Sequence, residues 1–489
     1  MRFPFQPNRS ILVKVARLLL CFGLALSVSA CEGGGPGDEV WEPETAKQST
    51  IGVPRTTAAP LTTEAATEAG TSAPETSVTD ASSVSDPSAP ASSEAVVTTT
   101  EEETTEPYNE LDWIDYEVKS KLTEEMYESA TKGLGTDNTF RMANVIKKAR
   151  AGEPVTILAF GGVATAGEGA TKVERSFDYL LRDYWKQTFP DSELTIARDI
   201  ASATDPYYAI HRAAMFIGLK PDLVLIDFSS FNSKSPAVAD AMTYLENLVR
   251  RFMAEETQPA VMLFYISTEV QSEDKDPQRT IGVRYRLPMI SFYDAVESGL
   301  AENVYDDRAA LTTGMNTLTD EGQTIFAAIL ERYFNNVRAA VRSNKTNTSY
   351  VLPNSSAEAS RYSGSHIADN ANIRPSAKAG IAKGSPVSPD YPNGWSANAP
   401  GFEITFKITA RNLGILYRAV PDPAGAEVDV FVDGNYIKTF SCADTSLTAP
   451  CDRSVELFCA GSKGQHVVTL RQKAGTAGSF FALLALLVS

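Results

Sequence analysis

Histidine is scarce in this sequence, and basic residues are outnumbered by acidic ones. The chain of 489 residues has 3 histidines, His211, His366 and His466. Chemistry that needs a histidine base therefore has few candidate residues. The 44 lysines and arginines face 61 aspartates and glutamates, and the net charge of −17 argues against a nucleic-acid partner, which needs a basic surface.

Signals for bound metals, phosphates and cofactors are also missing. The Gly-Gly turn near position 161 lacks the Lys-Ser/Thr pair of a phosphate-binding loop. The acidic residues Asp306, Asp307, Asp320 and Glu321 are better interpreted as a solvated face in so acidic a chain. We therefore expect no metal and no cofactor.

The 5 cysteines leave the redox state open. Cys21 would be removed with an N-terminal leader, whereas Cys442, Cys451 and Cys459 lie close together near the C-terminus. Their spacing does not match a zinc site with four ligands. One disulfide with one free thiol, or three thiols, are both compatible with the sequence.

Residues 1–31 have the pattern of a targeting segment. Arginines and lysine precede an apolar run at 18–28 that is too short for a comfortable membrane span. The run ends in Val-Ser-Ala-Cys, which resembles the lipobox of bacterial lipoproteins and implies that Cys31 carries lipid. An ordinary signal peptide with an incidental cysteine is the alternative. We expect an exported protein, anchored by lipid to the outer face of a bacterial cell membrane.

Residues 32–107 are rich in threonine, serine, alanine, glutamate and proline, with almost no large apolar side chains. Such a segment cannot bury enough surface to offset its ordering entropy. The composition predicts a disordered acidic tether that holds the folded part away from the membrane.

Residues 108–343 form the first predicted folded domain. The apolar run 155–160 stops at a Gly-Gly pair, as a buried parallel strand does at a sharp turn. Short apolar strands alternate with amphipathic helices, which predicts a parallel sheet covered on both faces in a flavodoxin-like three-layer α/β sandwich. The other strands are expected at 194–197, 223–227, 260–266 and 289–292, and the helices at 111–130, 138–151, 174–187, 207–217, 237–255 and 321–341.

The remaining residues fall into two segments that differ in composition and in hydrophobic pattern. Residues 344–400 are rich in Ser, Asn, Pro, Gly and Ala, which predicts a linker or extended wrap. In 401–489 apolar and polar residues alternate with a period of two, for example at 402–409 and at 428–432 before the hairpin signal Asp433-Gly434. This pattern predicts an all-β, jelly-roll-like sandwich.

Several segments of the first domain carry a family resemblance. NTFRMANVIKKARAGEPVTILAFGG, KPDLVLIDFSSFN, and YRLPMISFYDAV followed by TLTDEGQ resemble successive blocks of the SGNH/GDSL hydrolases. That family comprises esterases and acylhydrolases with a Ser-His-Asp triad on a flavodoxin-like fold. The resemblance covers 138–341, and the C-terminal sandwich resembles, more loosely, the β-domain appended to carbohydrate esterases of this kind.

The resemblance implies where a triad would lie, and the sequence departs from it at each position. The nucleophilic serine falls on Val163, the aspartate on Gly314 and the histidine on Thr317. A serine must attack, a histidine must take its proton, and an aspartate must orient that histidine. The loss of all three indicates a pseudoenzyme.

The oxyanion hole of the family is altered in the same way. Its glycine position falls on Ile200 or Ser202, and its asparagine position falls on Phe231. A shift of one residue would restore Asn232 as the asparagine, but it would restore neither nucleophile nor base.

A displaced triad is the competing interpretation. The segment FPDSELTIARDIASATDPYYAIHR lies where the family has its second block, a glycine-rich loop. His211 falls on the helix after that loop and is the one histidine near the site, although we expect it to be a packing or surface residue. Other hydroxyls near the site would need an activating base. The carboxylates near the site could supply an acidic group, but we expect them to cap turns or helices. These residues are Thr165, Ser229, Ser230, Asp199 and Asp205.

Three functions follow from these observations. The first is a surface lipoprotein that binds or scaffolds wall or extracellular polysaccharide without catalysis. The second is an active acyl esterase or deacetylase on polysaccharide with a rewired site, and the third is a purely structural wall spacer. Aromatic residues that would stack on sugars, if they are not core residues, are Trp395, Tyr391, Tyr362, Tyr417 and Tyr436.

Overall fold

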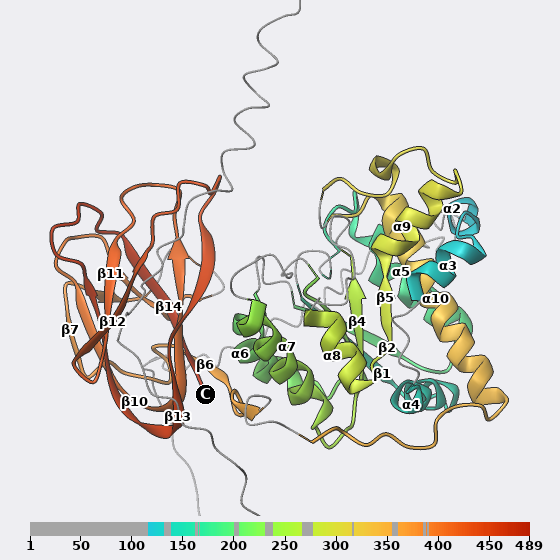
Figure 1. Ribbon diagram of the computed structural model, residues 1–489, viewed down its shortest axis with the longest axis horizontal. Helices are drawn as coiled ribbons and strands as arrows, with labels where there is room; N and C mark the ends of the chain where they lie inside the picture. The colour runs from blue at the N-terminus through green and yellow to red at the C-terminus, as the bar shows by residue number, and fades with distance from the viewer. Residues whose placement is uncertain are drawn as a thin grey trace, which may run out of the picture. The chain divides into compact units, whose positions relative to one another are not determined.

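The computed structural model (Figure 1) describes the two folded regions. The leader with Cys31 and the tether 32–107 lie outside the described residues, so their assignments stay predictions. No helix in the described part of the chain is long and apolar enough to cross a membrane. The described residues are 116–131, 138–161, 165, 167–199, 205–229, 238–266, 277–314, 317–354, 360–384, 388 and 391–489.

The first domain is built on a parallel sheet of 5 strands in the order β2-β1-β3-β4-β5. This is the strand order of flavodoxin-like folds, so the predicted α/β architecture is confirmed. Each strand lies within two residues of its predicted range. The strands are β1 (Val155–Gly161), β2 (Leu194–Arg198), β3 (Leu223–Asp227), β4 (Ala260–Tyr265) and β5 (Met289–Ser291).

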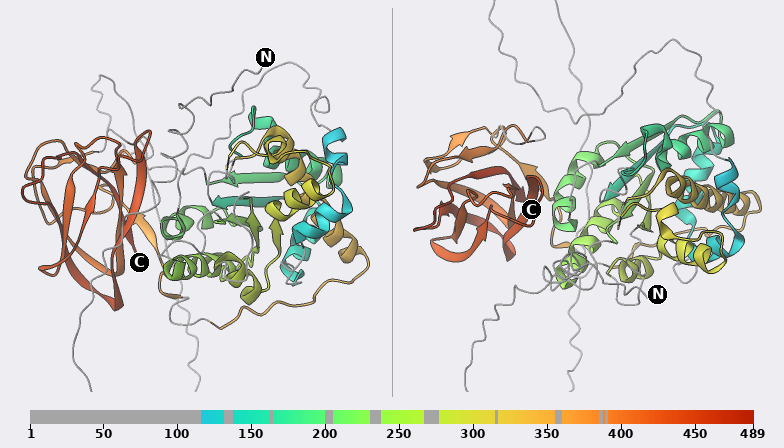
Figure 2. Two further views of the ribbon diagram at one scale, coloured as in Figure 1. Left: turned by 45° about the horizontal axis from the view of Figure 1, so that its top comes forward. Right: turned by 90° about the horizontal axis from the view of Figure 1, so that it is seen from above.

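Helices cover both faces of this sheet (Figure 2). Ile157 and Leu225 belong to one buried core, while their neighbours Leu158 and Val224 belong to the other, as expected when successive side chains point to opposite faces. The first core contains α3 (Glu124–Thr131), α4 (Phe140–Arg150), α5 (Phe177–Thr188), α9 (Phe292–Ala301) and α10 (Asp320–Arg342). The second contains α6 (Pro206–Ile217), α7 (Val238–Met253) and α8 (Pro277–Tyr285).

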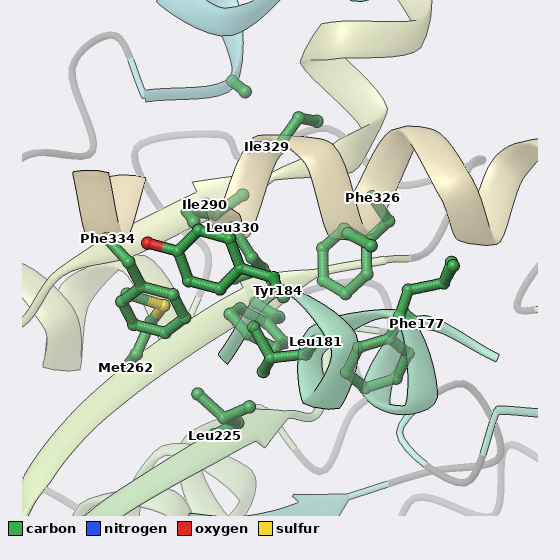
Figure 3. Close-up of a cluster of buried hydrophobic side chains, with 14 of the residues drawn as sticks. Phe177, Leu181, Tyr184, Leu225, Met262, Ile290, Phe326, Ile329, Leu330 and Phe334 are labelled. Atoms are coloured by element: carbon green, nitrogen blue, oxygen red, sulfur yellow. The ribbon is translucent and has the colours of Figure 1, made fainter. Parts of the chain in front are cut away.

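Aromatic side chains fill the first core. The ring of Phe326 on α10 packs edge-to-face against Phe177 of α5 and Phe264 of β4, with centroid distances of 5.1 and 5.0 Å. Figure 3 shows side chains from both helices, among them Phe326, Phe334 and Leu181, gathered around the strand residues Leu225 and Met262. Close packing of this kind fixes the strands against the helices that cover them.

One predicted helix needs correction, and two helices were missed. The helix expected at 111–130 is α2 (Tyr116–Ser120) and α3, separated at Thr123, whose hydroxyl caps α3 by accepting from the Met126 amide at 3.1 Å. Helices α8 and α9 were not predicted. Helix α9 begins directly at the end of β5 with the Ser291 hydroxyl as its cap, so no turn residue separates strand from helix.

The second domain is an antiparallel β-sandwich, as predicted. Its 9 strands run in the order β12-β11-β13-β10-β14-β9-β8, with β6 on β14 and β7 on β10. Both halves of the long strand β10 line one buried core with β11, β13 and β14, so the sheet folds over on itself. The strands are β6 (His366–Ala368), β7 (Ala377–Ala379), β8 (Ala382–Lys383), β9 (Trp395–Ala397), β10 (Glu403–Ala419), β11 (Glu427–Val432), β12 (Asn435–Ser441), β13 (Cys451–Gln472) and β14 (Phe481–Val488).

Part of 344–400, predicted as a linker or extended wrap, belongs to the sandwich. Strands β6 to β9 all lie in this range and pair with strands of the second domain. They have two or three residues each, too few for an alternating pattern to be recognised. The Trp395 side chain is 1% exposed and packs against Phe406 in the sandwich core.

The three cysteines of the sandwich are thiols that form no disulfide among the described residues. Cys442 is buried, Cys451 is half-buried and Cys459 is exposed. Burial raises the pKa of Cys442 to about 12, which keeps this thiol protonated and unreactive at neutral pH. The sequence left open either one disulfide with one thiol or three thiols, and the structure has three thiols.

Candidate functional site

The carboxyl ends of β1, β2 and β3 meet at one edge of the sheet. Gly161 is the register partner of Asp227, and a Cβ at position 161 would overlap the Asp227 carbonyl oxygen. The Asp199 amide donates to the Ala159 carbonyl at 2.8 Å. Loops that leave parallel strands at this edge are where open α/β sheets bind ligands. Their residues Val163, Ile200, Ser202, Ser230, Phe231 and Asn232 lie outside the described residues.

The segment after β1 is fastened to the start of α10. Gly169, at a φ of +95°, approaches Leu318 so closely that a Cβ on it would overlap the Leu318 carbonyl oxygen. The Thr171 amide and hydroxyl donate to the two oxygens of Asp320 at 2.8 and 2.6 Å. The Arg175 guanidinium donates to the same carboxylate at 2.6 Å. These bonds hold residues 169–175, which follow the expected nucleophile position, beside residues 318–320, which follow the expected histidine position.

The charge of Asp320 is stabilised at this junction. Burial alone would raise the pKa of Asp320, but hydrogen bonds from Thr171 and the ion pair with Arg175 outweigh burial and lower it. Asp320 also lies in the first turn of α10, where a carboxylate is favoured by the helix dipole, and Thr319 caps that helix. This carboxylate is therefore a structural link and not a free catalytic group.

Gly314 and Thr317 lie on one small turn just before α10. Thr312 and Leu318 form an antiparallel bridge, and the Thr313 amide donates to the Thr317 carbonyl at 3.0 Å. The Thr313 hydroxyl donates to the Thr317 hydroxyl at 3.0 Å, and a Cβ on Gly314 would stand 3.0 Å from that oxygen. Side chains at positions 314 and 317 would thus be neighbours, as an aspartate and a histidine of a triad must be.

His211 is buried in the second core. Its side chain is fully covered, its Nδ1 donates to the Tyr207 carbonyl at 2.9 Å, and its ring packs between Tyr207 and Tyr362. Burial is the main reason that the pKa of His211 falls to about 3. A fully covered imidazole has no path to a substrate, so its position indicates packing and not proton transfer.

The other two histidines have partners within the sandwich. His366 lies on β6, where it pairs with Val488 of β14. The Nδ1 of His466 on β13 lies 2.8 Å from a carboxylate oxygen of Asp433, at the β11–β12 turn. All 3 histidines of the chain are described, and none of the contacts found for them is with the turn of Gly314 and Thr317.

The remaining candidate groups are buried in structural contacts. Thr165 is 0% exposed and Ser229 is 1% exposed, and the Ser229 amide donates to the Asp227 carboxylate at 2.9 Å. Asp199 forms a buried ion pair with Arg212. Asp205 caps α6 by accepting from the Tyr208 amide at 2.7 Å, so both carboxylates make contacts within the protein.

Most of the aromatic residues proposed to stack on sugars are core residues. Tyr362 is 1% exposed, Tyr391 is 8% exposed, and Trp395 is likewise buried. Tyr417 is half-buried against Phe440. Tyr436 on β12 is 57% exposed and so remains a candidate for stacking.

Sequence reasoning missed the contacts that hold the site segments together. Gln323 of α10 accepts from the Phe177 amide at 3.0 Å and donates to the Glu168 carbonyl at 3.2 Å, bridging two loops. The pattern of 321–341 predicted a helix there, and α10 begins one residue earlier, at Asp320. Nothing in that pattern indicated that Asp320 and Gln323 would bind the segment after β1. No group of three or more potential metal ligands occurs among the described residues.

Comparison with known proteins shows the fold without assigning a family. The sequence matches no protein-family model and no curated protein. The structure is similar to that of a two-domain esterase (CEX) active on acetylated mannans, co-crystallised with mannopentaose, with a TM-score of 0.62 and 22% identity over 74% of this chain and 97% of that chain. A second structure of a two-domain esterase (CEX) active on acetylated mannans matches with a TM-score of 0.62 and 21% identity, over 74% of this chain and 98% of that chain. Coverage of nearly all of a two-domain chain means that both domains correspond.

Proposed function

We propose that this chain is an exported, lipid-anchored protein of the bacterial cell surface that binds wall or extracellular polysaccharide and does not hydrolyse esters. In this proposal its α/β domain keeps the architecture of an SGNH-type ester hydrolase and has lost the triad chemistry. The similarity to the two-domain esterase supports the architecture. The lipid anchor rests on the lipobox-like Cys31.

The observation that carries the loss of chemistry is the turn of Gly314 and Thr317. It has the spacing and adjacency of a triad turn, but a glycine hydrogen and a threonine hydroxyl stand where acid and base would be. Threonine cannot take a proton from a nucleophile at neutral pH. The fully covered His211 supports the same conclusion, because it is the histidine nearest in sequence to the second block.

Polysaccharide binding is supported by one face of the sandwich. The Tyr436 ring lies 5.8 Å from that of Phe431 on the neighbouring strand, and the Arg471 guanidinium covers Phe431 at 4.5 Å. Next to this pair the Thr439 hydroxyl donates to the Asp429 carboxylate at 2.7 Å. An exposed aromatic ring beside such polar groups suits a pyranose, which offers C–H bonds on its face and hydroxyls on its edge.

Affinity electrophoresis through gels that contain soluble acetylated mannan or xylan, together with a pull-down on peptidoglycan, tests this binding. We expect retardation or capture by at least one of these polymers, and at least a tenfold loss of affinity in Tyr436→Ala. Val351→Ala removes an apolar side chain that is 83% exposed and should bind as the wild type does. Absence of binding to all the polymers would refute the proposal.

The lost triad can be tested by restoring it. Gly314 has no positive φ, and the oxygen closest to its missing Cβ belongs to Thr317 itself. The replacement Thr317→His removes that oxygen, so Gly314→Asp can be accommodated. Together with Val163→Ser these changes should give measurable hydrolysis of p-nitrophenyl acetate if the fold is kept, whereas the same variant without Thr317→His should give none.

A further inference from the structure

One exposed aromatic ring on the outer face of the sandwich is held in place by hydrogen bonds. Tyr436 on β12 is the register partner of Phe431 on β11 and is 57% exposed. The Thr439 hydroxyl uses its one hydrogen to donate to Asp429, so in its bond of 2.9 Å with the Tyr436 hydroxyl the tyrosine is the donor. This chain of hydrogen bonds orients the ring before a ligand arrives, which lowers the entropy cost of stacking on it.

The same row of side chains continues across two further strands. Phe431 is the register partner of Thr469 on β13, and Thr469 is the register partner of Thr405 on β10. Register partners point to the same face of a sheet, and neighbouring strands lie about 4.8 Å apart, so the row is about 14 Å long. The Thr405 and Thr469 hydroxyls are 2.9 Å apart and share one hydrogen, which leaves one O–H and several lone pairs for a ligand. We call these four residues, Tyr436, Phe431, Thr469 and Thr405, the outer row.

Beside the outer row, an exposed arginine lies between two carboxylates. Arg471 on β13 has Asp429 of β11 and Glu403 of β10 as its register partners, and its guanidinium covers Phe431 at 4.5 Å. The carboxylates would repel an acidic sugar that approached the guanidinium. An uncharged sugar hydroxyl, in contrast, can accept from the guanidinium and donate to either carboxylate.

The whole face carries no excess of positive charge. Glu427 of β11 forms an ion pair of 2.5 Å with Lys473, which follows β13. The basic residues of the face are Lys407, Arg471 and Lys473, and the acidic residues are Glu403, Glu427 and Asp429. The chain as a whole has a net charge of −17, which also opposes an acidic polymer.

We infer that the outer row binds an extended, uncharged polysaccharide that lies across β12, β11, β13 and β10. One sugar ring stacks on Tyr436, and the hydroxyls of the following sugars bond to Arg471, Thr469 and Thr405. The inference rests on the proposed function, and it narrows the ligand from any wall or extracellular polysaccharide to a chain without carboxylate groups.

Titration calorimetry of the protein with mannohexaose and xylohexaose tests the extent of the site. We expect at least one hexaose to bind, and the corresponding disaccharide to bind about tenfold more weakly, because it is too short to reach from Tyr436 to Thr405. Arg471→Met and Thr469→Val should each weaken hexaose binding about fivefold. The matched control is Arg453→Met on the same strand, since Arg453 is exposed and pairs with Asp444 outside the outer row. This control should bind as the wild type does.

Hexagalacturonate, an acidic sugar chain of the same length, tests the charge argument. The wild type should bind it about tenfold more weakly than the preferred neutral hexaose. Glu403→Gln/Asp429→Asn removes both flanking charges and keeps an acceptor for Thr439, and it should raise the affinity for hexagalacturonate about tenfold.

Three results would overturn the inference and leave the proposed function standing. The first is stronger binding of hexagalacturonate than of either neutral hexaose by the wild type. The second is hexaose binding that Tyr436→Ala abolishes but Arg471→Met and Thr469→Val leave intact, because the site would then end at the tyrosine. The third is an unchanged affinity for hexagalacturonate in Glu403→Gln/Asp429→Asn. Binding to no saccharide at all would overturn the proposed function together with the inference, and this result differs from the other three.

Discussion

Gly169 and Leu318, far apart in the sequence, touch backbone to backbone and so join the segment after β1 to the turn before α10. Any side chain at position 169 would both adopt an unfavourable φ of +95° and overlap the Leu318 carbonyl. We expect Gly169→Ala to lower the free energy of unfolding by about 3 kcal/mol, the sum of backbone strain and overpacking. Urea unfolding followed by circular dichroism would measure this loss.

Gly384→Ala is the matched control for that substitution. Gly384 has a similar φ of +102°, but nothing lies within 4 Å of the place a Cβ would take. It should lose only the strain, about 1 kcal/mol. Equal losses in the two variants would mean that the contact with Leu318 contributes nothing.

His211 should make the fold sensitive to mild acid. Its pKa is about 3 in the folded chain, because of burial, against 6.5 when exposed. The folded state therefore keeps the imidazole neutral, and stability present above pH 6.5 is lost as pH falls below that value. Between pH 6.5 and 5 we expect a loss of about 2 kcal/mol. Chemical unfolding at a series of pH values would measure it.

His211→Gln keeps a donor for the Tyr207 carbonyl and removes the titration. Between pH 6.5 and 5 the free energy of unfolding of this variant should fall by about 2 kcal/mol less than that of the wild type does. Asp205 and Glu331, whose pKa values burial raises, act in the opposite direction in both proteins, so the difference isolates His211. Parallel pH profiles would contradict the buried, neutral imidazole.

Glu456 of β13 should be a strong contributor to stability. Its two carboxylate oxygens accept from the hydroxyls of Tyr362 and Tyr244, each at 2.7 Å. Glu456→Ala leaves both hydroxyls without this acceptor, and we expect a loss of about 2–3 kcal/mol in the free energy of unfolding. Arg453→Ala, on the same strand β13, breaks a solvent-exposed ion pair with Asp444 and should change stability by less than about 0.5 kcal/mol. If Glu456→Ala loses no more free energy of unfolding than the control variant, the contacts with the two tyrosines are weak.

The strands of the first domain were predictable because burial on both faces leaves a continuous apolar run. Val155 to Gly161 and Leu223 to Asp227 carry that signal, and a Gly-Gly pair or an aspartate marks where each ends. Helix α9 was missed because it follows Ser291 without a break. The short strands β6 and β9, the second of which contains Trp395, were missed because only their pairing with β14 marks them as strands.

The sequence names the candidate site positions, but it does not show how they are arranged in space. The family-like blocks located Gly314 and Thr317, but the adjacency of the two follows from the Thr312–Leu318 bridge. The burial of His211 depends on Tyr362, about which the local sequence of α6 carries no information. Likewise, Ser454 bonds to Asp205 across more than two hundred residues, a distance over which periodicity has no predictive value.

Turnover of p-nitrophenyl acetate and of acetylated mannan by the wild-type protein tests the central claim most directly. We expect no hydrolysis above the buffer rate, because Val163, Gly314 and Thr317 occupy the expected triad positions and supply no nucleophile, orienting acid or base. Hydrolysis that disappears in His211→Ala would contradict this account in favour of a rewired esterase. Hydrolysis that survives His211→Ala would equally contradict it and would indicate a different catalytic site.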